Sequence, residues 1–217
     1  MSRLERAVEV MDRLRSPGGC PWDAAQTHRS LARYLLEEAY EVLEALETDD
    51  VALLREELGD LLLQILFHAR LAEELPPAKA FSIEDVAGDL VDKLVRRHPH
   101  VFGDSDAPDA HAVNENWERQ KIAEKGRTSV ADGVPLAQPA LALAAKLVSR
   151  AGRAALDPPI ESGSSAEDEI GARLFAVVRD AVALGVDPEG ALRRVTRSYL
   201  SALRAAESDP ADPVEPR

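Results

Sequence analysis

Two short groups of acidic residues have the spacing of a metal site built on helices. The first group is Glu37, Glu38 and Glu41, and the second is Glu57 and Asp60. A helix has about 3.6 residues per turn, so residues three or four apart lie on one face, and each group presents its carboxylates together. Carboxylate oxygens are the ligands that Mg²⁺ and Mn²⁺ prefer in proteins. The spacing therefore predicts a divalent-cation site that two helices share.

The acidic residues also fall on the apolar stripe of each helix. Glu38 and Glu57 each share a helical stripe with three apolar side chains, which are Leu31, Leu35 and Val42 for the first and Leu54, Leu61 and Ile65 for the second. A carboxylate on a buried stripe is costly unless a cation compensates it. Zinc is not expected, because no histidine or cysteine lies at ligand spacing in these two helices. Magnesium, with manganese as a substitute, is the predicted ion.

The elements that position these groups are helices, because helical periodicity dominates the sequence and strand patterns are nearly absent. We predict helices over residues 3–15, 27–48, 50–74, 83–97, 112–126, 136–152, 167–184 and 188–206. Thr27 and Ser82 are the expected N-caps of two of them. The short connection near 48–50 predicts that the two acidic helices pack antiparallel. The Pro- and Gly-rich segment 16–21 predicts a non-helical break. The predicted fold class is an all-α helical bundle.

The composition restricts the class of protein. The chain has 217 residues, 45% of them apolar, which predicts a globular fold. The formal charge of −13 argues against a nucleic-acid-binding protein, although a bound cation would still allow a polyanionic small substrate. Cys20 is the only cysteine, so no internal disulfide can form. The sequence shows neither a signal peptide's apolar core nor an apolar run long enough to span a membrane, so we expect a soluble cytoplasmic protein.

The second half of the chain faintly repeats the first. Residues 57–63 align with 169–175, and residues 86–97 align with 191–202. The apolar spacing is kept, but the charged residues are not: alanine or serine replaces them at Ala172, Ser198 and Ala202. A decayed duplication is one reading, and chance similarity between amphipathic helices is the other. We predict a catalytic domain over 1–130, a degenerate copy over 131–207 and a disordered tail over 208–217.

Basic and aromatic residues at helical spacing follow the acidic groups. Lys93 and Arg97 form one pair four residues apart, and Trp117 and Lys121 form another. Cations opposite a triphosphate would neutralise its oxygens, and an indole would pack on sugar or base. The alternatives are surface charges and a core tryptophan. His98 and His100, which flank a proline at a helix end, are as compatible with capping and packing as with catalysis.

Five segments together resemble the MazG nucleoside triphosphate pyrophosphohydrolases. They are Cys20–Asp23, Gln26–Thr27, Leu36–Glu41, Glu56–Leu62 and Lys93–Phe102. The resemblance is strong over about residues 5–126 and weak over 134–206. An EExxE or ExxD motif alone is weakly specific, whereas the ordered combination is highly specific.

The resemblance implies a magnesium-dependent enzyme that cleaves a nucleoside triphosphate between the α and β phosphates, giving a monophosphate and pyrophosphate. It implies that four carboxylates hold the metal, with Glu37 beside them: these are Glu38, Glu41, Glu57 and Asp60. It implies nucleotide contacts from the residues Trp22, Lys93, Arg97, Trp117 and Lys121. A homodimer or higher homo-oligomer is expected, and broad-specificity housecleaning of the nucleotide pool is the expected role.

Two alternatives remain open from the sequence. The first is an enzyme whose substrate range is limited to a single dNTP or a phosphoribosyl nucleotide. The second is a non-catalytic scaffold or nucleotide sensor. The second unit lacks the EExxE motif and has Ala172 in place of the aspartate. Either the N-terminal unit is therefore the catalyst, or the protein is inactive.

Overall fold

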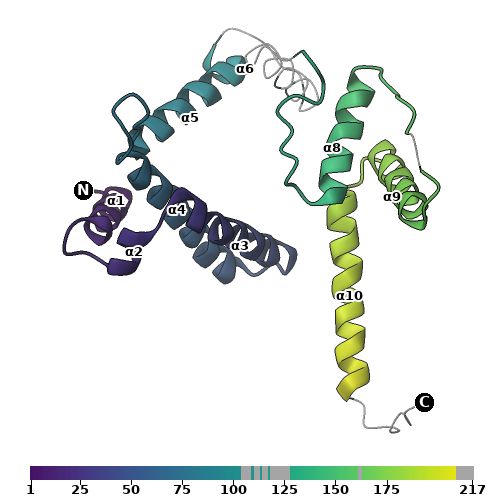
Figure 1. Ribbon diagram of the computed structural model, residues 1–217, viewed down its shortest axis with the longest axis horizontal. Coiled ribbons are helices and arrows are strands. Elements are labelled where there is room, and N and C mark those ends of the chain that lie inside the picture. Colours follow the sequence, from purple (N-terminus) through teal and green to yellow (C-terminus); the bar gives the residue numbers. More distant parts are fainter. Residues whose placement is uncertain (104–108, 110–112, 114–116, 118–127, 161–162, 209–217) are drawn as a thin grey trace. The chain divides into compact units, whose positions relative to one another are not determined.

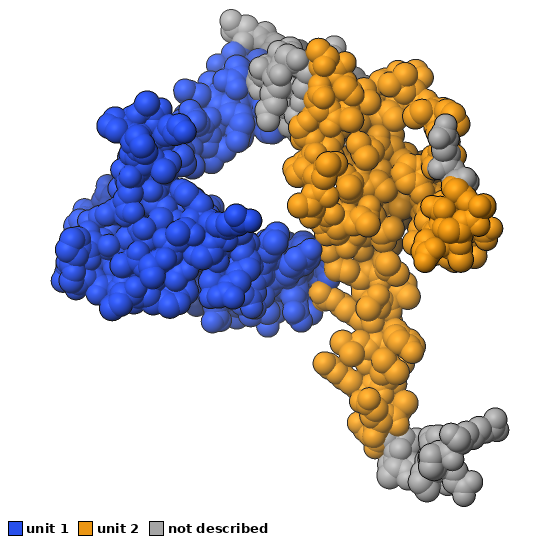
Figure 2. Space-filling view, in the orientation of Figure 1, with its two compact units in different colours: residues 1–118 blue, residues 119–217 orange. Residues whose placement is uncertain are grey.

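The computed structural model describes most of the chain, namely residues 1–103, 109, 113, 117, 128–160 and 163–208. Regular structure in these residues is helical, without a strand, which confirms the all-α fold class. In the same residues we find no helix with the length and apolarity that crossing a membrane requires. The chain divides into two compact units, unit 1 (residues 1–118) and unit 2 (residues 119–217), which Figure 2 shows in separate colours.

Unit 1 follows the predicted order of helices with two short additions (Figure 1). Its described helices are α1 (Arg3–Arg15), α2 (Pro21–Ala25), α3 (His28–Glu47), α4 (Val51–Ala72), α5 (Ile83–Arg97) and α6 (Pro99–Phe102). The short helices α2 and α6 were not predicted. The prediction that 16–21 is entirely non-helical is wrong at its last residue, because Pro21 begins α2. Proline suits this first position, since its φ is already helical and its missing N–H has no helical partner there.

Unit 2 contains α8 (Ala140–Arg153), α9 (Ala166–Ala183) and α10 (Pro188–Ser208). The helix predicted to start at 136 starts four residues later, because Pro139 occupies its N-cap with a non-helical ψ of 140°. In unit 1 the aligned segments lie on α4 and α5, which pack against each other, and in unit 2 they lie on α9 and α10, which also pack against each other. The duplication stays a prediction. The domain boundary at 130 also stays a prediction, because residues 118–127 lie outside the described part of the chain. The predicted tail, residues 209–217, and most of the helix predicted over 112–126 lie outside it as well.

Side-chain caps define the ends of the α3–α4 hairpin. The Thr27 hydroxyl accepts a hydrogen bond from the backbone N–H of Ser30 at 3.1 Å, which confirms the predicted N-cap of α3. Asp50 caps α4, where its Oδ1 accepts the N–H groups of Ala52 and Leu53 at 3.0 Å each. Such caps satisfy amide groups that have no partner within the helix. The turn between the helices is therefore tight, and α3 and α4 pack extensively against each other.

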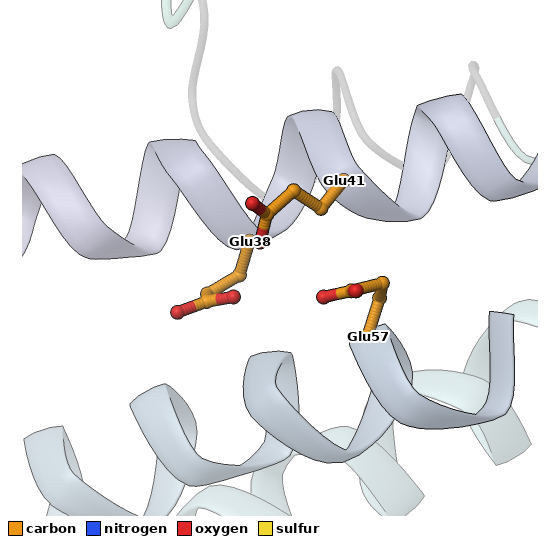
Figure 3. A group of neighbouring side chains, drawn as sticks. All are labelled: Glu38, Glu41 and Glu57. Atoms are coloured by element: carbon orange, nitrogen blue, oxygen red, sulfur yellow. The ribbon is translucent and has the colours of Figure 1, made fainter. Parts of the chain in front are cut away.

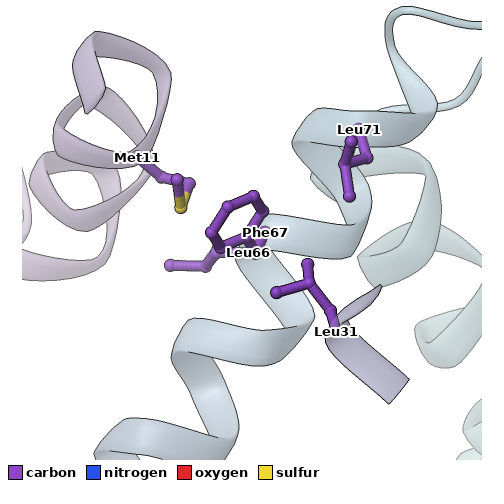
Figure 4. Packing of buried hydrophobic residues seen from close by; sticks show 5 residues of the cluster. All are labelled: Met11, Leu31, Leu66, Phe67 and Leu71. Carbon is purple, nitrogen blue, oxygen red and sulfur yellow. The ribbon is translucent and has the colours of Figure 1, made fainter. Parts of the chain in front are cut away.

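The core of unit 1 lies at the open end of this hairpin, where α1 covers it (Figure 4). It consists of buried side chains from three helices, which are Met11, Leu31, Leu66, Phe67 and Leu71. Two ion pairs join α1 to the end of α4 and to the residues just after it: Arg70 with Asp12 and Arg15 with Glu74, both at 2.7 Å. The core and the ion pairs hold α3 and α4 in one register, which in turn decides which acidic side chains meet.

Two histidines join the start of α3 to the later half of α4. The Nδ1 atoms of His28 and His68 lie 2.8 Å apart, and their ring planes differ by only 10°. The rings therefore meet through one hydrogen bond in which one Nδ1–H donates to the other Nδ1. Burial, followed by the charge of His28, lowers the pKa of His68. Protonation of His68 is thus less favourable in the folded chain than in the unfolded chain.

This pair predicts a loss of stability in mild acid. The unfolded chain takes up a proton near the ordinary histidine pKa of about 6.5, before folded His68 does, so the contribution of His68 is complete above that pH and declines below it. We expect His68→Phe to lose less stability than the wild type between about pH 7 and about pH 5. Melting temperatures of both proteins across this range test the prediction. Parallel declines in the two proteins would contradict it.

Candidate active site

Three glutamates from the α3–α4 hairpin converge, and we call Glu38, Glu41 and Glu57 the acidic cluster. One carboxylate oxygen from each lies within 4.8 Å of the other two (Figure 3). Glu57 is buried with 9% of its surface exposed, Glu38 is half-buried and Glu41 is exposed. The cluster is thus open on the side of Glu41 and closed behind Glu57.

The carboxylates of the cluster disturb one another electrostatically. Burial raises the pKa of Glu38 to about 6, helped by a hydrogen bond with Glu41 and by the charges of Asp60, Glu41 and Glu57. Burial also raises the pKa of Glu57, and the charges of Glu41 and Asp60 add to the effect. Like charges in a partly desolvated site disfavour ionisation, and a cation among them would reverse this.

The donor set therefore fits a hard divalent cation, because it offers carboxylate oxygens that need positive charge. Glu38, Glu41 and Glu57 would hold the ion. Asp60 is half-buried and close enough for its charge to act on Glu38 and Glu57, although its oxygens do not belong to the group within 4.8 Å. Glu37 is exposed on α3 and does not belong to the group either. Its predicted catalytic role stays a prediction.

Residues predicted to contact the nucleotide lie together at the C-terminal end of α5. The Arg97 guanidinium is buried and lies 5.3 Å from the centre of the Trp117 ring, which meets the His98 ring edge-on. His98 caps α5, and its Nδ1 lies 2.7 Å from the Leu94 carbonyl oxygen, which favours the structural role for this histidine. Lys93 is half-buried on α5.

The basic residues lie on a helix that does not contact the helix of Glu38 and Glu41. Among the described helices, α5 packs against α4 and α6 but not against α3. Lys121, which was expected beside Trp117, lies outside the described residues. The two groups of predicted site residues are therefore present in the same unit, on different elements.

Trp22 packs against aromatic side chains of α3 and α4. Its indole is half-exposed and meets the rings of Tyr34 and Phe67 edge-on, at 5.9 Å and 6.5 Å between centroids. Tyr34 is one helical turn before Glu38 on α3. Arg15 fixes the segment that carries Trp22, because its guanidinium donates to the backbone carbonyls of residues 23 and 26. These contacts place Trp22 on the α3–α4 hairpin, next to its apolar core.

One polar residue of the hairpin was not among the predicted site residues. Gln64 is buried in α4 with 5% of its surface exposed, and its side-chain Oε1 has no hydrogen-bond partner among the described residues. The signal for it was present in the sequence: Gln64 interrupts the apolar run 61–67.

The comparisons with known proteins identify the family of this chain. Residues 26–102 match the family model of the MazG nucleotide pyrophosphohydrolase domain. The chain is also 39% identical to the nucleoside triphosphate pyrophosphohydrolase/pyrophosphatase MazG of Thermotoga maritima, over 94% of this chain and 85% of that protein. It belongs to the MazG family. The matched segment of this MazG chain contains the acidic cluster and Asp60, together with Lys93 and Arg97 on α5.

Other relatives cover most of this MazG chain as well. The nucleoside triphosphate pyrophosphohydrolase of Escherichia coli is 36% identical over 95% of this chain and 88% of its own length. An uncharacterized 26.1 kDa protein of Streptomyces cacaoi is 53% identical over 95% of this chain and 83% of its own length. A crystal structure of a MazG-related protein from Thermotoga maritima is similar with a TM-score of 0.45 and 30% identity, and covers 54% of this chain and 97% of that one.

Proposed function

We propose that this MazG protein hydrolyses nucleoside triphosphates, including dNTPs, to a nucleoside monophosphate and pyrophosphate, and that it requires Mg²⁺, with Mn²⁺ as a substitute. The acidic cluster carries the proposal, because carboxylates that raise one another's pKa in a partly buried site favour a bound cation. The names of the Thermotoga and Escherichia relatives support the reaction. We also propose a broad choice of base, a cytoplasmic location and a role in clearing the nucleotide pool.

The carboxylates have different parts in this reaction. Glu57, the most buried, would anchor the ion, and exposed Glu41 would face the incoming triphosphate. When bound, the ion supplies positive charge that neutralises phosphate oxygens. A water molecule attacks phosphorus, one P–O bond of the anhydride breaks and the proton of the water passes to a carboxylate. Glu38, which is half-buried beside the other carboxylates, is the proposed acceptor of that proton. Asp60 completes the predicted metal-binding set.

The nucleotide-binding residues are proposed from their chemistry. Arg97 and Lys93 would donate charge-assisted hydrogen bonds to phosphate oxygens that the ion does not reach. Two tryptophans, Trp117 and half-exposed Trp22, offer aromatic surface for the nucleoside. The Trp117 ring lies against the Arg97 guanidinium. Lys121 is proposed as a further phosphate contact from the resemblance alone.

We propose that the active form is a homodimer or a higher homo-oligomer. Large apolar side chains are exposed on the three main helices of unit 1, and examples are Leu36 on α3, Leu58 and Ile65 on α4 and Val91 on α5. A second copy that covered these side chains would also bring a second α5 toward the hairpin. Such an assembly would allow Arg97 and Lys93 of one copy to complete the acidic cluster of the other. Unit 2, in which Ala172 stands at the position of Asp60, would serve as scaffold.

Metal dependence tests the proposal. Pyrophosphate release from a panel of NTPs and dNTPs should rise with added Mg²⁺, fall to background with excess EDTA and return when Mg²⁺ or Mn²⁺ is restored. Rates should differ little among the bases. Turnover that persists in EDTA would contradict the assignment of the acidic cluster as a metal site.

A further inference from the structure

Gln64 belongs by position to the same helix face as the metal-binding carboxylates of α4. It lies seven residues after Glu57 and four after Asp60, and these intervals place all three side chains on one side of the helix. That side faces α3, because Phe67 and His68, the next residues on it, meet partners from α3. The Gln64 side chain is therefore directed into the hairpin, which its burial supports.

The register of the hairpin places Gln64 between the apolar core and the acidic cluster. His28 lies beside His68 and Leu31 shares the core with Phe67 at the open end, while Glu41 meets Glu57 toward the turn. Gln64 precedes Phe67 by one turn and so lies between the apolar core and the acidic cluster. It is the polar residue at the inner end of the candidate active site.

In this position the Gln64 carboxamide has an unsatisfied hydrogen-bond acceptor. Its Oε1 is buried and accepts no hydrogen bond from the described residues. A buried acceptor without a donor destabilises the fold, and a leucine or methionine would avoid that cost. The neighbouring carboxylates cannot donate when they are ionised, because they are then acceptors only. A water molecule meets both needs, since it can donate one hydrogen to Oε1 and the other to a carboxylate.

We propose that Gln64 is a positioning residue of the active site, whose Oε1 accepts a hydrogen bond from an ordered water molecule that donates its second hydrogen to a carboxylate of the acidic cluster or to Asp60. The water orients that carboxylate toward the ion. This inference rests on the proposed function, because it assumes that the cluster binds a metal. Groups behind metal ligands contribute about 10- to 100-fold to metal affinity or activity.

The test measures Mn²⁺ binding to the full chain by titration calorimetry, without nucleotide. Gln64→Met keeps the length of the side chain and removes the acceptor. We expect it to weaken Mn²⁺ binding about 10- to 100-fold while the melting temperature stays the same or rises. Leu66→Met is the matched control: it introduces the same residue two positions away on α4, and we expect wild-type Mn²⁺ affinity.

Two results would overturn the inference. The first is Mn²⁺ binding by Gln64→Met within about twofold of the wild type, against the loss expected for a residue behind the ligands. The second comes from a high-resolution crystal structure of the wild type, which does not depend on the folding of any variant: a protein donor, rather than water, on Gln64 Oε1 would refute the proposal. Failure of the wild type to bind Mn²⁺ would instead overturn the proposed function, and this inference with it.

Discussion

Replacing Glu57 by glutamine should lower pyrophosphate release by at least about 100-fold. Residues that only support metal ligands already contribute about 10- to 100-fold to metal affinity or activity, and Glu57 is a proposed ligand itself. The same change should raise the melting temperature. Glu57 is buried beside Glu41 and Asp60, and burial together with these charges raises its pKa, so its ionised form destabilises the fold at neutral pH. Glutamine keeps the shape and removes the charge. Initial rates with saturating Mg²⁺ and thermal melts of the same preparation test both effects.

The chain offers a matched control for this substitution. Glu169 on α9 occupies the position that aligns with Glu57 in the repeat, but it is exposed, and Ala172 follows it where an aspartate would be needed. Glu169→Gln should leave pyrophosphate release unchanged. Loss of turnover in Glu169→Gln, with retention in Glu57→Gln, would transfer the catalytic role to unit 2 and contradict the assignment to unit 1.

Replacing Arg97 by methionine should lower kcat/KM for a nucleoside triphosphate by about 100-fold. Hydrogen bonds to charged groups contribute about 1.5–3 kcal/mol each, so at the lower value two bonds from one guanidinium to phosphate account for roughly 3 kcal/mol, which corresponds to a factor of about 100. Methionine retains the packing volume under Trp117 but cannot donate. Steady-state kinetics over a range of substrate concentrations, with a thermal melt to verify folding, provide the measurement.

Arg96 serves as the control for Arg97, because it is the adjacent residue on α5 and carries the same charge, but is exposed. Arg96→Met should reduce kcat/KM only slightly, since an exposed charge is screened by solvent and salt. Equal losses in the two variants would indicate a general effect of charge. An unchanged kcat/KM in Arg97→Met would remove Arg97 from the proposed binding site.

Local sequence patterns were sufficient to predict the helices that carry the site. The bounds of α1 and α5 agree with the predicted ones, and Thr27 and Ser82 cap their helices as expected, because capping depends on residues only three positions away. The convergence of Glu38 and Glu41 with Glu57 also follows from periodicity and one short turn. These features depend on neighbours in sequence, which a single chain displays directly.

Contacts between distant residues could not be predicted in the same way. His28 and His68 are 40 positions apart, and their hydrogen bond depends on the register of the hairpin. Register also determines that Gln64 is buried. The short helix α6 begins with Pro99 directly after the C-cap of α5, at a position where the sequence predicts only the end of a helix. The described helix α5 contacts α4 but not α3, and the assembly proposed to bring its basic residues to the acidic cluster is encoded in no local pattern.

The most direct test of the central claim is the identity of the products. A ³¹P NMR spectrum of ATP incubated with the full chain and Mg²⁺ should show AMP and pyrophosphate appearing in equal amounts. When Glu57→Gln replaces the wild type, the ATP signals should stay unchanged over the same period. ADP with inorganic phosphate as the products, or equal turnover by the wild type and Glu57→Gln, would contradict the assignment of pyrophosphohydrolysis to the acidic cluster of the α3–α4 hairpin.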